Sequence, residues 1–231
     1  MWINWNDLPE SMKNEQVRHY YKILKKKQGS LIVKRGFDIV ASLVMLILLS
    51  WLFLILAVAI KVDSHGPVFY RQVRVTTGNR DFRIFKFRTM INNADKIGSL
   101  VTTGNDSRIT RIGAKIRKCR LDEIPQLLNI LKGEMSFVGT RPEVRKYVDR
   151  YTDEMMATLL MPAGVTSLAS ISFKDEDELI DEYTEKGMSV DDAYMEKVLP
   201  EKMKYNLEYM NQIGAFQDIK LMIQTFVSVI K

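Results

Sequence analysis

The sequence predicts a mainly helical α+β protein, in which an N-terminal membrane-embedded helix precedes a small β-hairpin and a helical domain. Three observations lead to this fold class: one long apolar run, two β-rich runs separated by a turn, and helical spacing of apolar residues through most of the remaining chain. Of 231 residues, 46% are hydrophobic and 27% are charged. A chain of this composition buries a core and is not intrinsically disordered.

The chain is basic, with a net charge of +6 and an isoelectric point near 9.2. This charge excludes an acidic scaffold and favours anionic partners, such as phospholipids, nucleic acids or phosphorylated metabolites. The mean hydropathy of −0.11 excludes a polytopic transporter. Cys119 is the single cysteine, so no intrachain disulfide can form and a reducing compartment is expected.

The apolar run extends from Ile39 to Ile60 without a formal charge. As a helix its length would match the roughly 30 Å hydrocarbon core of a bilayer, and it has no polar face to place against water. Basic residues flank both ends, so the positive-inside rule gives no orientation. A re-entrant hairpin would need a break, for which Ser50 and Trp51 lie at the midpoint. The residues alone leave a straight span and a hairpin open.

We expect three segments: a basic N-terminal arm (1–33), the membrane helix (34–63) and a further domain (64–231). Apolar residues in the arm recur at helical spacing between polar ones, which indicates an amphipathic helix. Such a helix fits either the membrane surface or the face of the following domain, and both placements remain open.

In the third segment, 68–75 and 82–87 are β-rich runs joined by a turn-like TTGNRD, which predicts a hairpin. A basic helix is expected near 109–121, and the string LDEIPQLLNILKG predicts a second helix, with Pro125 in its first turn and Gly133 after its end. A loop is expected around Pro162 and Gly164. The C-terminal DIKLMIQTFVSVIK predicts a helix that packs on the core or lies against a membrane.

Two adjacent carboxylates, Asp122 and Glu123, stand at the start of the second predicted helix, directly after a basic segment. One could attack phosphorus or move a proton while the other holds a divalent cation. Attack on a phosphate is opposed by like charge, so it needs neighbouring cations. The alternative is an acidic first turn that only complements the helix dipole.

Further cations could meet phosphate groups. Lys86 and Arg88 are two residues apart on a predicted strand and so share a face, and Gly139-Thr140-Arg141-Pro142 restrains an arginine. Arg117 lies just before the acidic pair. Together they favour phosphates at a lipid–water interface over nucleic acid, for which the chain carries no binding motif. A Cys or His metal site is not expected, because the two histidines are far apart in sequence.

These motifs resemble the bacterial sugar transferases, that is, the monotopic polyprenyl-phosphate phosphoglycosyl transferases. The resemblance is carried by KRGFDIVASLVMLILLS, DSHGPVFYRQVRV, KFRTM, PAGVTSLASI and, most specifically, SRITRIGAKIRKCRLDEIPQLLNILKGEMSFVGTRPEV. It implies a re-entrant helix in the bacterial inner membrane and a catalytic domain on the cytoplasmic face. The chain departs from the family at Trp51, where a proline usually breaks the helix.

The resemblance also implies an activity: transfer of a sugar-1-phosphate from a UDP-sugar to polyprenyl phosphate, such as undecaprenyl phosphate, with release of UMP. This would be the first membrane step of capsule, exopolysaccharide, O-antigen or glycoprotein glycan assembly. By motif, Asp122 would form a covalent phosphosugar intermediate and Glu123 would bind Mg²⁺. The side chains of Lys86, Arg88, Arg117 and Arg141 would bind phosphates and substrate.

Two rival functions remain at this point. A non-catalytic, membrane-anchored module that binds anionic lipid or protein explains the charge and the apolar run, but makes no demand on Asp122 or Arg141. A membrane-tethered nucleic-acid binder predicts binding that weakens steeply with salt and is independent of any sugar. The oligomeric state is open in all three cases.

Overall fold

A computed structural model describes residues 3–94, 97, 106–173 and 176–230. The first half of the chain holds, in order, α1 (Glu15–Lys26), α2 (Gln28–Leu48), α3 (Ser50–Asp63), β1 (Phe69–Thr76), β2 (Arg80–Phe87), α4 (Arg111–Lys118), a 3₁₀ segment (Leu121–Gln126) and α5 (Leu127–Lys132). The second half holds β3 (Met135–Val138), α6 (Arg145–Val148), a 3₁₀ segment (Met155–Leu160), β4 (Ala163–Thr166), α7 (Leu168–Ser172), α8 (Glu176–Glu185), α9 (Val190–Ala193), a π-helical turn (Tyr194–Val198), α10 (Leu199–Gln212) and α11 (Ala215–Ile230). The predicted class, a mainly helical α+β fold with a small hairpin, is confirmed.

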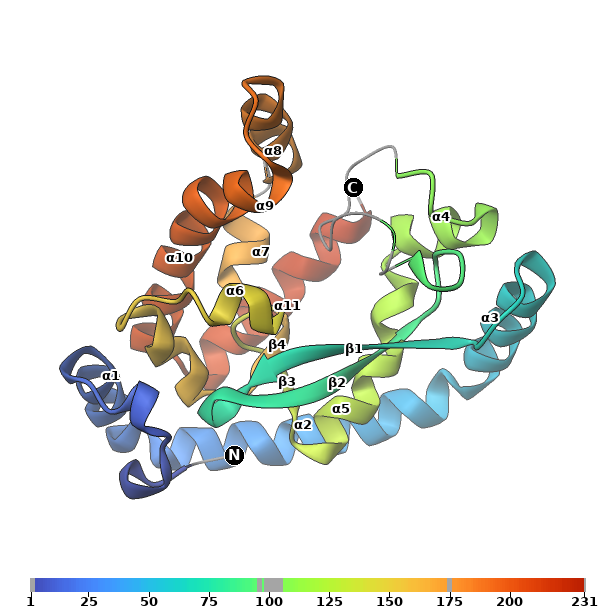
Figure 1. Cartoon of the computed structure of the whole chain (residues 1–231). Coiled ribbons are helices and arrows are strands. Elements are labelled where there is room, and N and C mark those ends of the chain that lie inside the picture. The colour runs from blue at the N-terminus through green and yellow to red at the C-terminus, as the bar shows by residue number, and fades with distance from the viewer. Residues whose placement is uncertain (1–2, 95–96, 98–105, 174–175, 231) are drawn as a thin grey trace.

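The apolar run forms two helices that meet at an angle. The axes of α2 and α3 bend by 61° at Leu49, and the hydroxyl of Ser50 donates a hydrogen bond of 2.8 Å to the carbonyl of Ile47. Among the described residues no single helix is long and apolar enough to cross a membrane, although this bent pair has the length and composition in combination. In Figure 1, α2 runs along the lower edge of the molecule and α3 rises at its right-hand side. The break therefore falls where the sequence placed it.

Helix α1 packs on the body of the protein, so the second of the two placements left open for the N-terminal arm is the one observed. Its apolar stripe of Val17, Tyr20 and Leu24 is buried against the 3₁₀ segment 155–160 and α10. The side chain of Asn14 caps the helix by accepting a hydrogen bond from the Val17 amide. The arm and the C-terminal domain consequently share one hydrophobic core.

Strands β1 and β2 form the predicted antiparallel hairpin, with Phe69 opposite Phe87 and Thr76 opposite Arg80. The hairpin stretches diagonally across the front of the molecule in Figure 1. Phe82 and Ile84 of β2 are buried against α5 and β3. Lys86 lies on the same face of the strand, because side chains two residues apart point the same way, and it lines the polar cavity described below.

A second, parallel pair of strands was not predicted. Residues 163–166, expected to be a loop around Pro162 and Gly164, form β4 and pair with β3, so that Met135 lies opposite Ala163. Each strand has only four residues, and the partners lie far apart in the sequence. A local pattern cannot reveal such a pairing.

The string LDEIPQLLNILKG begins as a 3₁₀ segment and becomes α-helical only at Leu127, which corrects the single helix predicted there. Pro125 lies inside the 3₁₀ segment and not in the first turn of an α-helix. Gly133 ends α5 as expected, because its φ of 79° is the left-handed conformation that glycine adopts without strain. Asp122 and Glu123 thus stand on a tight turn that α5 anchors in the core.

Candidate active site

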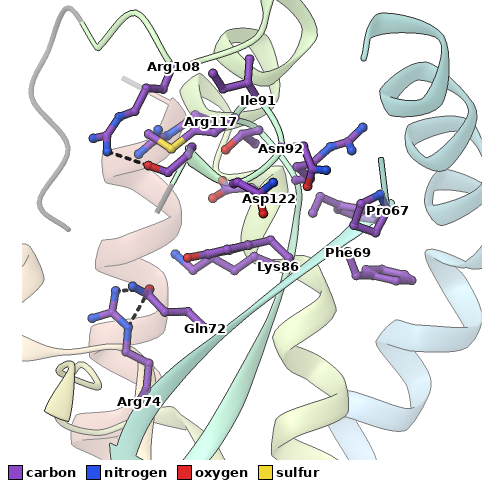
Figure 2. Close-up of a pocket in the computed structure, with 17 residues that line it drawn as sticks. Pro67, Phe69, Gln72, Arg74, Lys86, Ile91, Asn92, Arg108, Arg117 and Asp122 are labelled. Carbon is purple, nitrogen blue, oxygen red and sulfur yellow. Dashed lines mark hydrogen bonds between the residues drawn. The ribbon is translucent and has the colours of Figure 1, made fainter. Parts of the chain in front are cut away.

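A polar cavity of about 310 Å³ lies between the hairpin, α4 and the 3₁₀ segment 121–126 (Figure 2). One face of β1 and the end of β2 form one side, and Arg117 of α4 and Asp122 form the other. The close-up places Lys86 and Asp122 next to each other within this space, with Arg117 beyond them. Four of the six predicted site residues therefore line one cavity, namely Lys86, Arg88, Arg117 and Asp122, whereas Glu123 and Arg141 do not.

Glu123 is held by two cations. Its Oε1 atom accepts a hydrogen bond of 2.9 Å from the Lys86 ammonium and one of 2.8 Å from the Arg141 guanidinium. Burial by itself raises the pKa of the Glu123 carboxyl, but Arg141 and Lys86 more than offset burial and hold that pKa well below its usual range. The ion pair with Glu123 in turn raises the pKa of Arg141. Glu123 is therefore an anion throughout the ordinary pH range.

The carboxylate of Asp122 differs from that of Glu123 in its partners and in its pKa. Asp122 is buried at 9% exposure and lines the cavity, yet its carboxylate makes no hydrogen bond or ion pair with another described residue. Burial raises the pKa of the Asp122 carboxyl above its usual value, an effect that the charge of Lys86 partly opposes. A carboxylate that is neither neutralised by a direct partner nor fully hydrated is suited to act as a nucleophile.

Arg88 also lines the cavity, but its guanidinium is engaged elsewhere. It donates hydrogen bonds of 2.8 Å to the carbonyl of His65 and 2.6 Å to the carbonyl of Ser64, beyond the end of α3. Gly66 makes this possible: a Cβ atom there would lie 1.9 Å from Nη1 of Arg88, and the φ of 132° also favours glycine. In this structure Arg88 ties the end of α3 to the cavity wall.

Sequence reasoning missed Gln72 and Arg74, which line the same cavity from β1. The two side chains are joined by a hydrogen bond of 2.7 Å from the Arg74 guanidinium to the amide oxygen of Gln72 (Figure 2). Burial lowers the pKa of Arg74, and Glu143 opposes this effect. The alternation of Tyr70, Gln72 and Arg74 along one strand was the signal that could have found them.

The carboxylates fit a metal ion only in part. In the portion of the chain that the structure describes, no three His, Cys, Asp or Glu side chains gather closely enough to hold one. Both cations bind Oε1 of Glu123, and no hydrogen bond to Oε2 is found among those residues. Mg²⁺ is commonly bound by one or two carboxylates together with substrate phosphates and water. Glu123 fits that pattern.

The family model described as bacterial sugar transferase matches residues 29–231, which is most of the chain and includes the whole site. This chain belongs to the bacterial sugar transferase family. The resemblance of the LDE, KFRTM and GTRP motifs is thus confirmed.

The curated relatives that this chain resembles are named as follows. It is 50% identical over 142 residues to a UDP-N-acetylgalactosamine-undecaprenyl-phosphate N-acetylgalactosaminephosphotransferase of Aeromonas hydrophila, covering 60% of this chain and 34% of the relative. It is 36% identical over 205 residues to an undecaprenyl-phosphate glucose phosphotransferase of Komagataeibacter xylinus, covering 86% and 36% of the two chains. A UDP-glucose:undecaprenyl-phosphate glucose-1-phosphate transferase of Klebsiella pneumoniae is 33% identical over 202 residues, covering 85% and 40%. The chain thus spans a third to two fifths of the length of these relatives.

Proposed function

We propose that this protein is a phosphoglycosyl transferase that moves a sugar-1-phosphate from a UDP-sugar to polyprenyl phosphate. The observation that carries the proposal is the contrast within the acidic pair: Glu123 is fixed by Lys86 and Arg141, whereas Asp122 faces the cavity without a direct partner. Family membership and the names of the relatives support the same reaction.

The reaction proceeds in two displacements at one phosphorus atom. An oxygen of Asp122 attacks the phosphorus that carries the sugar, the bond from this phosphorus to the bridging oxygen breaks, and UMP leaves with that oxygen. An oxygen of polyprenyl phosphate then attacks the same phosphorus. The acyl–phosphate bond breaks, which frees the Asp122 carboxylate and yields polyprenyl diphosphosugar. Each step forms one P–O bond and breaks one.

Like charges oppose the first step, because a carboxylate must approach a diphosphate. Lys86, Arg117 and Arg141 surround the acidic pair and lower this repulsion, since a cation in a partly buried site interacts strongly with developing charge. Bound Mg²⁺ would withdraw charge from the diphosphate oxygens, with Oε2 of Glu123 as its protein ligand. The raised pKa of Asp122 makes its carboxylate more basic, and hence more nucleophilic, than an exposed aspartate.

The bent pair α2–α3 supports a place at the cytoplasmic face of the bacterial inner membrane. Helix α1 precedes the pair and β1 follows it, and both belong to the same folded body. A straight crossing would separate these two flanks by a bilayer. A re-entrant hairpin with its bend at Leu49 keeps them on one side, where the soluble donor and the lipid phosphate can meet.

The test is the release of UMP from a panel of UDP-sugars, with polyprenyl phosphate and Mg²⁺ present. We expect Asp122→Asn to reduce turnover by at least about 10³-fold and to abolish the mass increase of the protein after incubation with donor alone. Asp153→Asn makes the same change at an exposed carboxylate and serves as the control. Near-normal turnover of Asp122→Asn would show that another group is the nucleophile.

A further inference from the structure

A second cavity, of about 380 Å³, lies on the other side of the 3₁₀ segment that carries the acidic pair. Its wall is predominantly apolar and draws on elements from across the fold, among them Met45 of α2, Leu127 of α5, Phe137 of β3, Val165 of β4, and Met222 and Phe226 of α11. We call it the apolar groove. In Figure 1, α11 passes behind the strands β3 and β4, where it contacts both of them.

The apolar groove reaches the reactive segment. Cys119, Arg120 and Glu123 form part of its lining, so the same short stretch of chain separates it from the polar cavity. Arg120 is exposed and has φ of 52°, a left-handed conformation uncommon for residues other than glycine. No ion pair or hydrogen bond of its guanidinium is found within the described part of the chain. A cation is thus available at the edge of an apolar groove.

We propose that the apolar groove binds the first isoprene units of the polyprenyl phosphate acceptor, with Arg120 meeting its phosphate. This rests on the proposed function. An isoprenoid gains free energy when it leaves water for an apolar wall, and its anionic end requires a cation beside the acidic pair. The groove offers both, whereas the polar cavity suits the water-soluble donor. Met45 belongs to the apolar helix α2, so the groove is continuous with the surface proposed to enter the membrane.

The exposed Cys119 allows a test that does not depend on turnover. In detergent micelles containing the full chain, polyprenyl phosphate should make alkylation of Cys119 roughly tenfold slower at about ten times its dissociation constant. UDP-sugar alone should leave the rate unchanged. The control is Ala114→Cys in a Cys119→Ser background, an exposed site on α4 outside both cavities, which should not be protected.

Two pairs of variants test the chemistry of the groove. Arg120→Asn keeps a residue that tolerates a left-handed backbone but removes the charge, so polyprenyl phosphate should protect Cys119 less well. Arg120→Lys keeps the charge and should retain the protection.

Ser228→Trp places a large side chain in the groove and should raise the KM for the acceptor by roughly tenfold, which corresponds to the loss of about two methylene groups of the isoprenoid from the apolar wall. The KM for the donor should stay unchanged. Gln224→Trp, exposed on the same helix but outside the groove, should change neither.

The outcomes separate this proposal from the function on which it rests. Unprotected Cys119 in an enzyme that turns over would overturn the groove and leave the transferase intact. Equal protection by phosphatidylglycerol, or equal protection at position 114, would also overturn it, because either result indicates general shielding by lipid. Selective protection without turnover on any UDP-sugar would support prenyl phosphate binding in the groove and count against the transferase.

Discussion

Lys86 and Arg141 hold Glu123 from two directions, and both cations converge on a single carboxylate oxygen. This arrangement fixes the turn that also carries Asp122, so the orientation of one carboxylate depends on the neutralisation of the other. Lys86 has a second effect, because its charge also favours the ionised form of Asp122. One lysine thus influences the geometry and the titration of the acidic pair.

Removing the charge of Lys86 should shift the pH dependence of activity. Lys86 lowers the pKa of Asp122, so Lys86→Met should raise that pKa and move the acid limb of the kcat/KM profile for UMP release to higher pH. Lys86→Arg keeps the charge and should leave the limb near its original position. An unmoved profile in Lys86→Met would show that Asp122 does not control this limb.

Glu123→Gln should weaken the dependence on magnesium. The amide cannot supply a negative charge to the ion, and it no longer pairs with Arg141, so the Mg²⁺ concentration for half-maximal activity should rise at least about tenfold. A titration of UMP release against Mg²⁺ measures this. Glu178→Gln, at an exposed position on α8, is the matched control. If the titration of Glu123→Gln is unchanged, Glu123 is not the ligand.

Among the secondary-structure elements, α2 is fastened to the body by a buried ion pair. Lys34 of α2 lies 2.6 Å from Asp218 of α11, and the two side chains are only 5% and 9% exposed. The hydroxyl of Tyr209 on α10 donates to the other oxygen of Asp218 at 2.7 Å. Three helices meet at this carboxylate, which fixes the direction in which α2 leaves the domain.

Removing one partner of the Lys34–Asp218 pair should lower the stability of the fold substantially. Asp218→Ala leaves Lys34 buried without a counter-charge and should lower the free energy of unfolding by about 3–5 kcal/mol. Glu201→Ala removes the partner of the exposed Lys204 and should cost less than about 1 kcal/mol. Denaturant unfolding of the detergent-solubilised chain measures both. Similar losses for the two variants would mean that the buried pair does not fasten α2.

For the whole molecule, the important relation is that the segments before and after the bent α2–α3 pair belong to one folded body. The N-terminal α1 contributes to the same core as α10 and the 3₁₀ segment 155–160, while α3 leads directly into the hairpin of the site. The polar cavity is lined only by residues that follow the apolar pair, while the segment before the pair packs into the body that supports them. The distance of the site from a bilayer surface would be set by how deeply the pair inserts.

This relation predicts the accessibility of the two flanks. In a Cys119→Ser background, Gln28→Cys and His65→Cys place exposed thiols at opposite ends of the α2–α3 pair. A membrane-impermeant maleimide added outside intact cells should label neither, and both should react after permeabilisation. Labelling of one position from outside would establish a straight crossing and exclude the hairpin.

The sequence predicted those features that depend on local pattern. The apolar run and the β-hairpin followed from composition, alternation and spacing, whereas a site shared by Lys86 and Asp122 was implied only by the resemblance to the sugar transferases. The strands β3 and β4 escaped prediction because each is short and its partner is distant in sequence. The 3₁₀ form of 121–126 escaped as well, because its residues suit an α-helix and tertiary packing decides between the two.

The engagement of Arg88 was likewise hidden from the sequence. Its motif indicates a phosphate ligand, but the carbonyls at the end of α3 come within its reach only after folding. Its role toward substrate remains a prediction. The ion pair between Glu123 and Arg141 was hidden in the same way, because the two residues lie 18 positions apart in the sequence and meet only in the folded chain.

The close approach of Gly66 and Arg88 has a consequence for the evolution of this chain. Position 66 is constrained twice, by the Arg88 guanidinium against which a Cβ would collide and by its backbone φ of 132°. Loss of the arginine would remove the collision but not the conformational demand. Lineages that replace Arg88 should therefore still retain glycine at 66, while the reverse order of change should be rare.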